Sequence, residues 1–151
     1  MPSTDKAEQG AISTVFQRTL EVRTSGQGFV DITAEVAGIV AEAGKKTGLC
    51  TVFLQHTSAS LVIQENADPA VLRDLQRWMT RLAPEGSGYE HDEEGPDDMP
   101  GHLRSAITRS SEVIPIVGGR LGLGRWQALY LWEHRRAAHV RRLVVTVLGT
   151  G

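Results

Sequence analysis

The chain has 151 residues, of which 40% are hydrophobic and 23% charged, and a formal net charge of −2. This length and balance are typical of one folded domain and exclude a disordered chain. The small net charge excludes a global positive field that would hold nucleic acid or an anionic membrane, so we expect neither as a partner.

Residues 1–10 and the single cysteine carry little functional signal. Residues 1–10 are polar and unpatterned, which predicts a tail outside a single domain at residues 11–151. They lack an apolar signal core, and apolar stretches such as residues 143–148 are far shorter than the roughly 20 residues that span a bilayer. We therefore expect a cytoplasmic protein. Cys50 lies in an apolar run, which predicts a buried, inert thiol.

The first expected elements are a strand and a helix. Residues 13–23 alternate apolar and polar side chains, as in a half-buried strand, and the Gly-Gln-Gly at residues 26–28 predicts a turn. From Asp31 the apolar residues recur at helical spacing, with Asp31 or Thr33 as the N-cap and Gly44 as the stop. The inner face of this helix is expected to comprise Ile32, Val36, Ile39, Val40 and Ala43.

Two more strands and a second helix are expected next. Residues 49–56 and 60–64 are rich in β-branched and aromatic side chains, and the short link between them predicts a pair of adjacent strands. Asp68 and Pro69 then open a helix as its N-cap and first residue. The inner face of this second helix is expected to comprise Leu72, Leu75, Trp78, Met79 and Leu82.

An acidic segment precedes the last elements. Residues 84–101 contain seven acidic residues and no Lys or Arg, which predicts a functional loop, with a merely solvated loop as the alternative. A short helix at residues 100–109 is expected to pack Leu103, Ala106 and Ile107 inward. Three strands are expected at residues 112–117, 126–133 and 141–148. This order predicts an α+β fold, an antiparallel sheet or sandwich with attached helices.

Three histidines are candidate metal ligands. His56 ends a predicted strand, His91 lies in the acidic segment, and His102 lies in the first turn of the following helix, where the helix dipole favours a neutral imidazole. Three such ligands leave one coordination position open, as in catalytic zinc sites. Their spacing matches no compact metal signature, so three unconnected histidines are the alternative.

Acidic residues near these histidines have candidate roles of their own. Asp92, Asp97 and Asp98 are candidate catalytic residues, because a carboxylate beside a metal serves as a general base. Together with Glu94 they are also candidates for orienting the imidazole rings or for additional metal ligands. The Asp-Asp-Met-Pro at residues 97–100 is also typical of helix capping, which is the alternative for Asp97 and Asp98.

Two other segments contain candidate contacts for a substrate. Ser58 lies in a hydroxyl-rich stretch that suits an anion site and a tight turn equally. Arg125 and Gln127 flank Trp126 after a glycine-rich segment. Such a segment offers backbone N–H groups to a phosphate, but it matches no known phosphate loop, and hairpin geometry is favoured.

Three stretches of the sequence resemble one known family. They are LQHTSASLVIQENADP, YEHDEEGPDDMPGHLRSAI and GRLGLGRWQALYLWEHR, and they resemble the YjbQ family, often called secondary thiamine-phosphate synthases. The likeness runs from residue 13 to residue 149 with the same order and spacing. It implies a mostly antiparallel two-sheet β-sandwich with about three helices, assembled as a homotrimer. It also implies that His56, His91 and His102 are the metal-site residues.

The resemblance also implies an activity. The family name implies that a pyrimidine pyrophosphate is joined to a thiazole phosphate, with a divalent metal, zinc before magnesium or manganese, and a phosphorylated or anionic small molecule as the ligand. A hydrolase with the same histidine site and a non-catalytic trimeric protein that binds a metal or metabolite are the alternatives. The family's usual Gly-Thr-Trp-Gln is Gly-Arg-Trp-Gln at residues 124–127, which leaves the role of Arg125 open.

Overall fold

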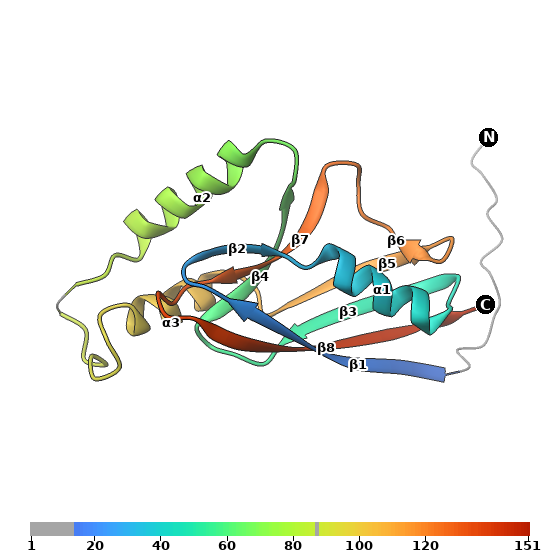
Figure 1. Cartoon of the computed structure of the whole chain (residues 1–151), viewed down its shortest axis with the longest axis horizontal. Helices are drawn as coiled ribbons and strands as arrows, with labels where there is room; N and C mark the ends of the chain where they lie inside the picture. Colours follow the sequence, from blue (N-terminus) through green and yellow to red (C-terminus); the bar gives the residue numbers. More distant parts are fainter. Residues whose placement is uncertain (1–13, 87) are drawn as a thin grey trace.

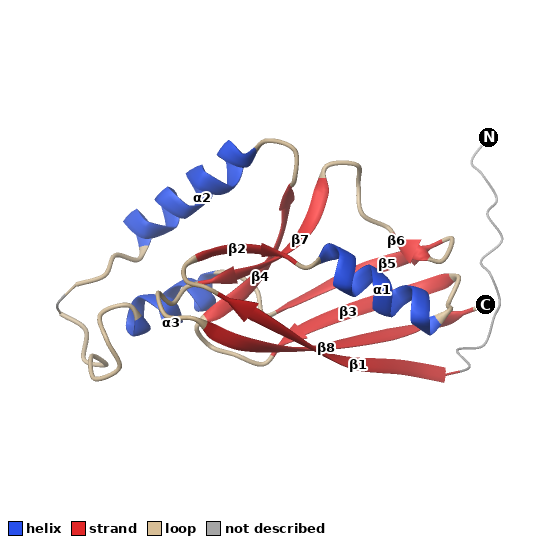
Figure 2. Cartoon of the chain, viewed as in Figure 1, coloured by secondary structure: helices blue, strands red, loops and turns tan. Residues whose placement is uncertain are grey.

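The chain folds into two antiparallel sheets and three helices in the computed structural model, which describes residues 14–86 and 88–151 (Figure 1, Figure 2). The larger sheet has the order β1 (Thr14–Thr24), β8 (His139–Thr150), β3 (Thr47–Leu54), β5 (Ser111–Val117) and β6 (Arg120–Leu121). The smaller sheet has the order β2 (Gly28–Asp31), β7 (Gln127–Glu133) and β4 (Ala59–Glu65). The helices are α1 (Thr33–Ala43), α2 (Pro69–Leu82) and α3 (Asp98–Ile107). The predicted α+β fold is confirmed.

The core lies between the inner face of the larger sheet, the smaller sheet and α1. Strands β3 and β8 alternate buried and more exposed residues, because one face of the sheet packs inward and the other faces solvent. The inward residues of these two strands are Cys50, Val52, Leu54, Leu143, Val145 and Val147. Helix α1 contributes Val36, Ile39 and Val40, and the smaller sheet contributes Leu61, Leu129 and Leu131. Cys50 is fully buried, and burial raises the pKa of its thiol to about 11, as expected for an inert cysteine.

The start of α1 differs from the prediction. Gly28–Asp31 form strand β2, which pairs with β7, although the glycines predicted only a turn. Phe29 of β2 stacks on Trp132 of β7 with ring centroids 4.5 Å apart, so a partner distant in sequence stabilises this short strand. The N-cap position is Ile32, not Asp31 or Thr33. The predicted stop is confirmed, because Gly44 caps the helix with a left-handed φ of 66°.

The predicted pairing of residues 49–56 with residues 60–64 is wrong. Strand β3 pairs with β5 on one side and β8 on the other, whereas β4 pairs with β7. Both edges of β3 are therefore occupied, and the short link after it carries the chain from the larger sheet to the smaller one. Sequence periodicity predicts a strand but does not identify its neighbour.

Helix α2 begins as predicted but packs differently. Asp68 accepts a hydrogen bond from the backbone N–H of Ala70 at 2.9 Å, with Pro69 in the first position. Met79 is the buried residue of the predicted inner face, whereas Trp78 is 48% and Leu82 53% exposed. Helix α2 lies to one side of the two sheets (Figure 1), so its apolar stripe is only partly covered.

Helix α3 starts earlier and turns a different face inward than predicted. It begins at Asp98, two residues before the predicted start at residue 100, and ends at Ile107. The predicted inward residues Ala106 and Ile107 are exposed. Arg104, which was not among the predicted inward residues, is buried, and its Nε and Nη2 donate to the carbonyl of Ala83. Because the carbonyl of Ala83 accepts its hydrogen bonds, Arg104 can be buried on the inner face of α3, which the pattern predicted to be aliphatic.

The structure leaves three sequence predictions open. Residues 1–10, the predicted tail, lie outside the described residues, and the assignment of residues 11–151 to one domain stays a prediction. Within residues 14–86 and 88–151, no helix is long and apolar enough to cross a membrane. The cytoplasmic location stays a prediction.

Candidate metal centre

Two of the three candidate histidines meet one of the candidate aspartates at the start of α3. Asp98 Oδ2 lies 2.6 Å from His91 Nε2 and 3.2 Å from His102 Nε2. One ligand atom from each of the three residues lies within 4.8 Å of the others. Asp98 and His102 share a helix face because they are four residues apart, and the preceding loop brings His91 to them.

Asp98 is the buried member of this cluster. It is 2% exposed, and its second oxygen, Oδ1, accepts from Arg135 Nη1 at 2.7 Å. Burial alone would raise the pKa of Asp98, but the hydrogen bond from His91 and the nearby charge of Arg135 outweigh it, so the pKa lies below its usual value. The hydrogen bond to Asp98 in turn raises the pKa of His91. Asp98 is therefore an ionised carboxylate facing two imidazoles.

His56 lies outside this cluster. Its Nε2 accepts from the backbone N–H of Arg142 at 2.9 Å, and its Nδ1 lies 3.3 Å from Arg141 Nη1. Burial and then the charge of Arg141 lower the pKa of His56. His56 and His102 do line one cavity of about 250 Å³. Since both ring nitrogens of His56 face N–H donors, the structure does not bring it to the metal cluster, and its role as a ligand stays a prediction.

The other two candidate acids have different surroundings. Asp97 Oδ2 accepts from Arg135 Nε at 3.0 Å and from the backbone N–H of Arg136 at 2.9 Å, which joins the start of α3 to the turn after β7. Asp92 is exposed and lies outside the cluster. Glu94 Oε2 lies 3.6 Å from His91 Nε2, as expected for a residue that orients this imidazole. Catalytic roles for Asp92, Asp97 and Asp98 stay predictions.

Ser58, a candidate substrate contact, belongs to a buried polar network. Its Oγ accepts from Arg141 Nη2 at 3.1 Å, and Ser58 is 8% exposed. Arg141 also pairs with Glu133, which accepts a hydrogen bond from Thr24. The hydroxyl of Ser58 thus has a structural partner.

Arg125 and Gln127 lie far from the metal cluster. Gln127 begins β7, whereas the turn that contacts Asp97 and Asp98 follows Glu133 at the other end of that strand, roughly 20 Å away at the usual rise per residue. Gln127 Oε1 accepts from the backbone N–H of residue 124, and Arg125 lies over the Trp126 ring at 4.8 Å. The structure does not gather these two with the cluster, and their roles as substrate contacts stay predictions.

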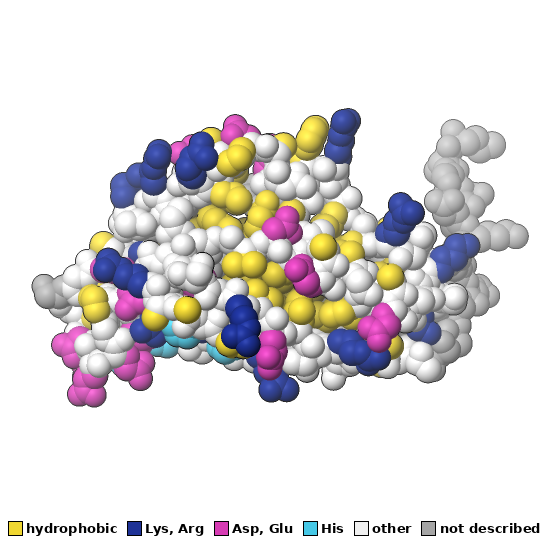
Figure 3. Space-filling view, in the orientation of Figure 1, with side chains coloured by type: hydrophobic (Ala, Val, Ile, Leu, Met, Phe, Trp, Pro, Cys, Tyr) yellow, Lys and Arg dark blue, Asp and Glu magenta, His cyan; other side chains and the backbone are white. Residues whose placement is uncertain are grey.

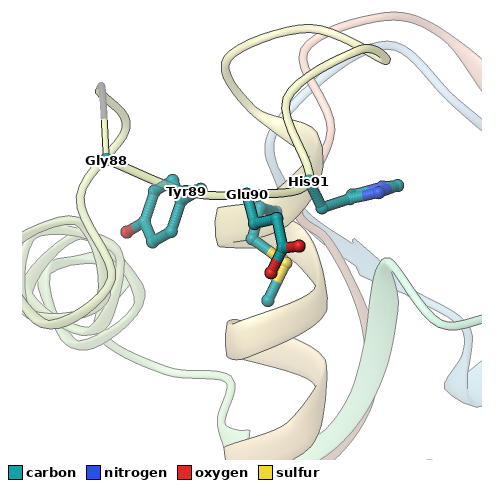
Figure 4. A pocket seen from close by; sticks show the side chains of 5 residues that line it. Gly88, Tyr89, Glu90 and His91 are labelled. Carbon is teal, nitrogen blue, oxygen red and sulfur yellow. The ribbon is translucent and has the colours of Figure 1, made fainter.

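A cavity of about 510 Å³ lies beside His91. Gly88, Tyr89, Glu90, His91 and Met99 line it. Figure 4 shows that the imidazole of His91 points away from the side chains of Tyr89 and Glu90. Acidic side chains gather at this end of the molecule, next to histidine (Figure 3). His91 therefore belongs both to the acidic loop and to the metal cluster.

Sequence reasoning did not single out Arg135 and Arg141, whose side chains contact candidate site residues. The available signal for Arg135 was the run Glu-His-Arg-Arg at residues 133–136, which begins at the last residue of the buried strand β7. Charged residues at a strand end are positioned by the sheet, as His56 was expected to be. Their partners, Asp97, Asp98 and Glu133, only became identifiable from the tertiary contacts.

The fold and the cluster define a class: an α+β protein of two antiparallel sheets with a His-Asp-His group at the start of its third helix. A family model described as "UPF0047 protein YjbQ-like" matches residues 18–150. The chain therefore belongs to the YjbQ family, as the resemblance predicted.

Relatives support this assignment along nearly the whole chain. A UPF0047 protein of Synechocystis is 54% identical over 134 residues, which are 88% of this chain and 91% of the relative. The YjbQ protein of Escherichia coli O157:H7 is 41% identical over 135 residues, which are 89% of this chain and 98% of the relative.

Solved structures show the same fold. A protein of the YjbQ/UPF0047 family from Clostridium acetobutylicum, described as uncharacterised, matches with a TM-score of 0.76 and 34% identity over 87% of this chain and 98% of its own. A conserved hypothetical protein from Thermus thermophilus matches with a TM-score of 0.74 and 38% identity over 84% of this chain and 97% of its own.

The predicted thiamine-phosphate synthase activity is wrong. The matching family and relatives carry only a UPF0047 designation, and the similar protein from Clostridium acetobutylicum is described as uncharacterised. The enzyme family that makes thiamine phosphate has a different fold. The prediction failed because it rested on a family name and on no residue contact that selects a pyrimidine or thiazole ring.

Proposed function

We propose that this chain binds a divalent transition metal through His91, Asp98 and His102. The supporting observation is that one buried carboxylate oxygen, Asp98 Oδ2, faces the Nε2 atoms of both imidazoles. Two nitrogen donors and one oxygen donor suit zinc, whereas magnesium prefers a shell of oxygens, so zinc is the first candidate and magnesium or manganese come second.

The donor set fits such an ion. Ligand atoms around a tetrahedral zinc lie about 3.4 Å apart. The ligand atoms here lie within 4.8 Å of one another, so small movements suffice. A hydrogen-bonded His-Asp-His cluster without a metal is the alternative; in it, both Nε2 atoms carry a proton that points to Asp98. A metal would replace both protons.

Three protein ligands would leave a coordination position open on a bound zinc ion, which would supply Lewis-acid chemistry there. The chain's own groups shape the surroundings of that position. Asp98 provides the negative charge, His91 provides a ligand from the loop, and the cavity next to His102 provides space for a small molecule. An anionic small molecule as the ligand remains a proposal.

Metal titration tests the proposal. Protein purified without an affinity tag and stripped with a chelator should bind one zinc ion per chain in calorimetry. Asp98→Asn and His102→Ala should each lower the affinity beyond the roughly 10- to 100-fold that is typical of outer partners of a metal site.

His139→Ala is the matched control, because this histidine lies outside the cluster and its Nδ1 donates to the carbonyl of Ala137. It should leave zinc affinity unchanged. A wild-type chain that binds no zinc, or an Asp98→Asn variant that binds as tightly as His139→Ala, would contradict the proposal.

A further inference from the structure

We propose that Arg135 is the positioning residue of this metal site. Its guanidinium holds the loop and the first turn of α3 together, so that Asp98 presents Oδ2 to His91 and His102. The inference rests on the proposed metal binding and identifies the residue that makes the cluster ready for the ion.

Each nitrogen of the Arg135 guanidinium contacts a different residue. Nε donates to Asp97 Oδ2 at 3.0 Å, Nη1 to Asp98 Oδ1 at 2.7 Å, and Nη2 to the carbonyl of Glu94 at 3.0 Å. Because the guanidinium is planar and rigid, these three bonds fix the loop and the helix start relative to each other. His91 lies in that loop, so its approach to α3 depends on the same contacts.

The two oxygens of Asp98 are divided between Arg135 and the histidines. Oδ1 accepts from Arg135, and Oδ2 faces His91 and His102. Since a carboxylate is planar, a bond that holds Oδ1 also sets the direction of Oδ2. Asp98 is nearly inaccessible to water, so no solvent competes for Oδ1. Arg135 therefore sets the orientation of the Asp98 carboxylate.

The backbone around Arg135 is itself held in place. Its N–H donates to Glu133 Oε2 at 3.3 Å, and its side chain is 16% exposed. A Cβ atom added at Gly101 would lie 3.4 Å from Arg135 Cδ and 3.3 Å from Ser58 Cβ. Gly101 thus lets α3 approach Arg135 closely. The Arg135 side chain packs against α3 where it reaches Asp98.

Removal of Arg135 should change the metal affinity in opposite directions, depending on whether its charge or its positioning of Asp98 dominates. Arg135 is a cation near a cation site, so its removal would strengthen metal binding if long-range repulsion dominated. If orientation of Asp98 dominates, its removal weakens binding by roughly 10- to 100-fold, as is typical of residues that hold metal ligands. The sign of the change therefore separates the two explanations.

The experiment compares zinc affinity in the stripped full-length wild type, Arg135→Ala, Arg135→Lys and Arg136→Ala. Arg135→Ala should bind roughly 10- to 100-fold more weakly. Arg135→Lys keeps the charge but not the three-way contact, so it should also bind more weakly than wild type. Arg136→Ala is the control, because this guanidinium is exposed and pairs with Glu85.

The visible spectrum of bound Co²⁺ gives a second measurement, because it reports coordination geometry and not stability. It should change in Arg135→Ala and stay the same in Arg136→Ala. Unchanged or tighter zinc binding in Arg135→Ala would overturn the inference while leaving the proposed metal binding intact. If Arg135→Ala does not fold, Arg135→Lys decides: wild-type affinity in that variant overturns the inference.

A wild-type chain without zinc affinity would instead defeat the proposed function. In that case a crystal structure of Arg135→Lys still tests whether Arg135 positions Asp98. An Asp98 carboxylate displaced from the two imidazoles supports positioning, and an unmoved carboxylate overturns it.

Discussion

Arg141 and Glu133 form an ion pair that is almost completely closed off from solvent and joins the two sheets. Arg141 Nε donates to Glu133 Oε1 at 2.8 Å, and the exposed fractions of the two residues are 3% and 0%. Burial alone would raise the pKa of Glu133, but the hydrogen bonds from Arg141 and Thr24 outweigh it and hold the pKa below its usual value. Arg141 lies in β8 of the larger sheet and Glu133 in β7 of the smaller one.

Removal of one partner of this pair should destabilise the fold strongly. Arg141→Leu leaves the Glu133 carboxylate buried without its cation, and such changes cost about 3–5 kcal/mol. Urea unfolding of wild type and variant measures the difference. The double variant Arg141→Leu with Glu133→Leu should recover part of the loss, because no buried charge remains. A single variant that costs under about 1 kcal/mol, the range of exposed ion pairs, would show that the pair contributes little.

His134 should make the fold less stable in mild acid. It is fully buried, with Nε2 2.8 Å from Ser60 Oγ, and burial lowers its pKa from the ordinary 6.5 to about 3. Between these values the unfolded chain binds a proton that the folded chain does not, so stability falls as the pH falls from 6.5 towards 3. At pH 5 the loss from this group should be about 2 kcal/mol.

The variant His134→Gln isolates this effect, because glutamine stays neutral and can still bond to Ser60. Urea midpoints of wild type and variant at pH 8 and pH 5 should show the wild type losing more stability. Equal losses in the two proteins would mean that His134 does not titrate as proposed.

His56→Ala tests which residues ligate the metal. Because Nε2 of His56 accepts from the backbone N–H of Arg142, we expect the variant to leave zinc affinity nearly unchanged. The comparison is with His102→Ala in the same titration. A loss in His56→Ala as large as that in His102→Ala would support the original set of three histidines and a rearrangement of His56 upon binding.

The homotrimer implied by the family resemblance is testable by light scattering. The outer face of the larger sheet exposes Val15, Leu49, Phe53, Val113 and Val117, an apolar surface that association with further copies of this chain would cover. The mass in solution should be about three times that of the chain. A single-chain mass at micromolar concentration would contradict the expectation.

Local patterns were sufficient for most of the elements. The strands predicted from alternation at residues 13–23 and 141–148, the cap at Asp68 and the stop at Gly44 all depend on neighbouring residues. The structure confirms them over the residues that it describes, from Thr14 onward in the first strand. The candidate site was also partly predictable, since His91, Asp98 and His102 stood out as ligand types in or beside an acidic loop.

The sequence by itself therefore determined most of the segments that become strands and helices, because backbone preferences and side-chain periodicity act over a few residues. The short strands β2 and β6 were not among them. Tertiary structure alone decided that β3 and β4 lie in different sheets, that Arg104 is buried, and that Arg135 holds Asp98. These outcomes depend on which surfaces meet after the chain has turned back on itself, and residues so distant in sequence leave no periodic pattern that identifies their partners.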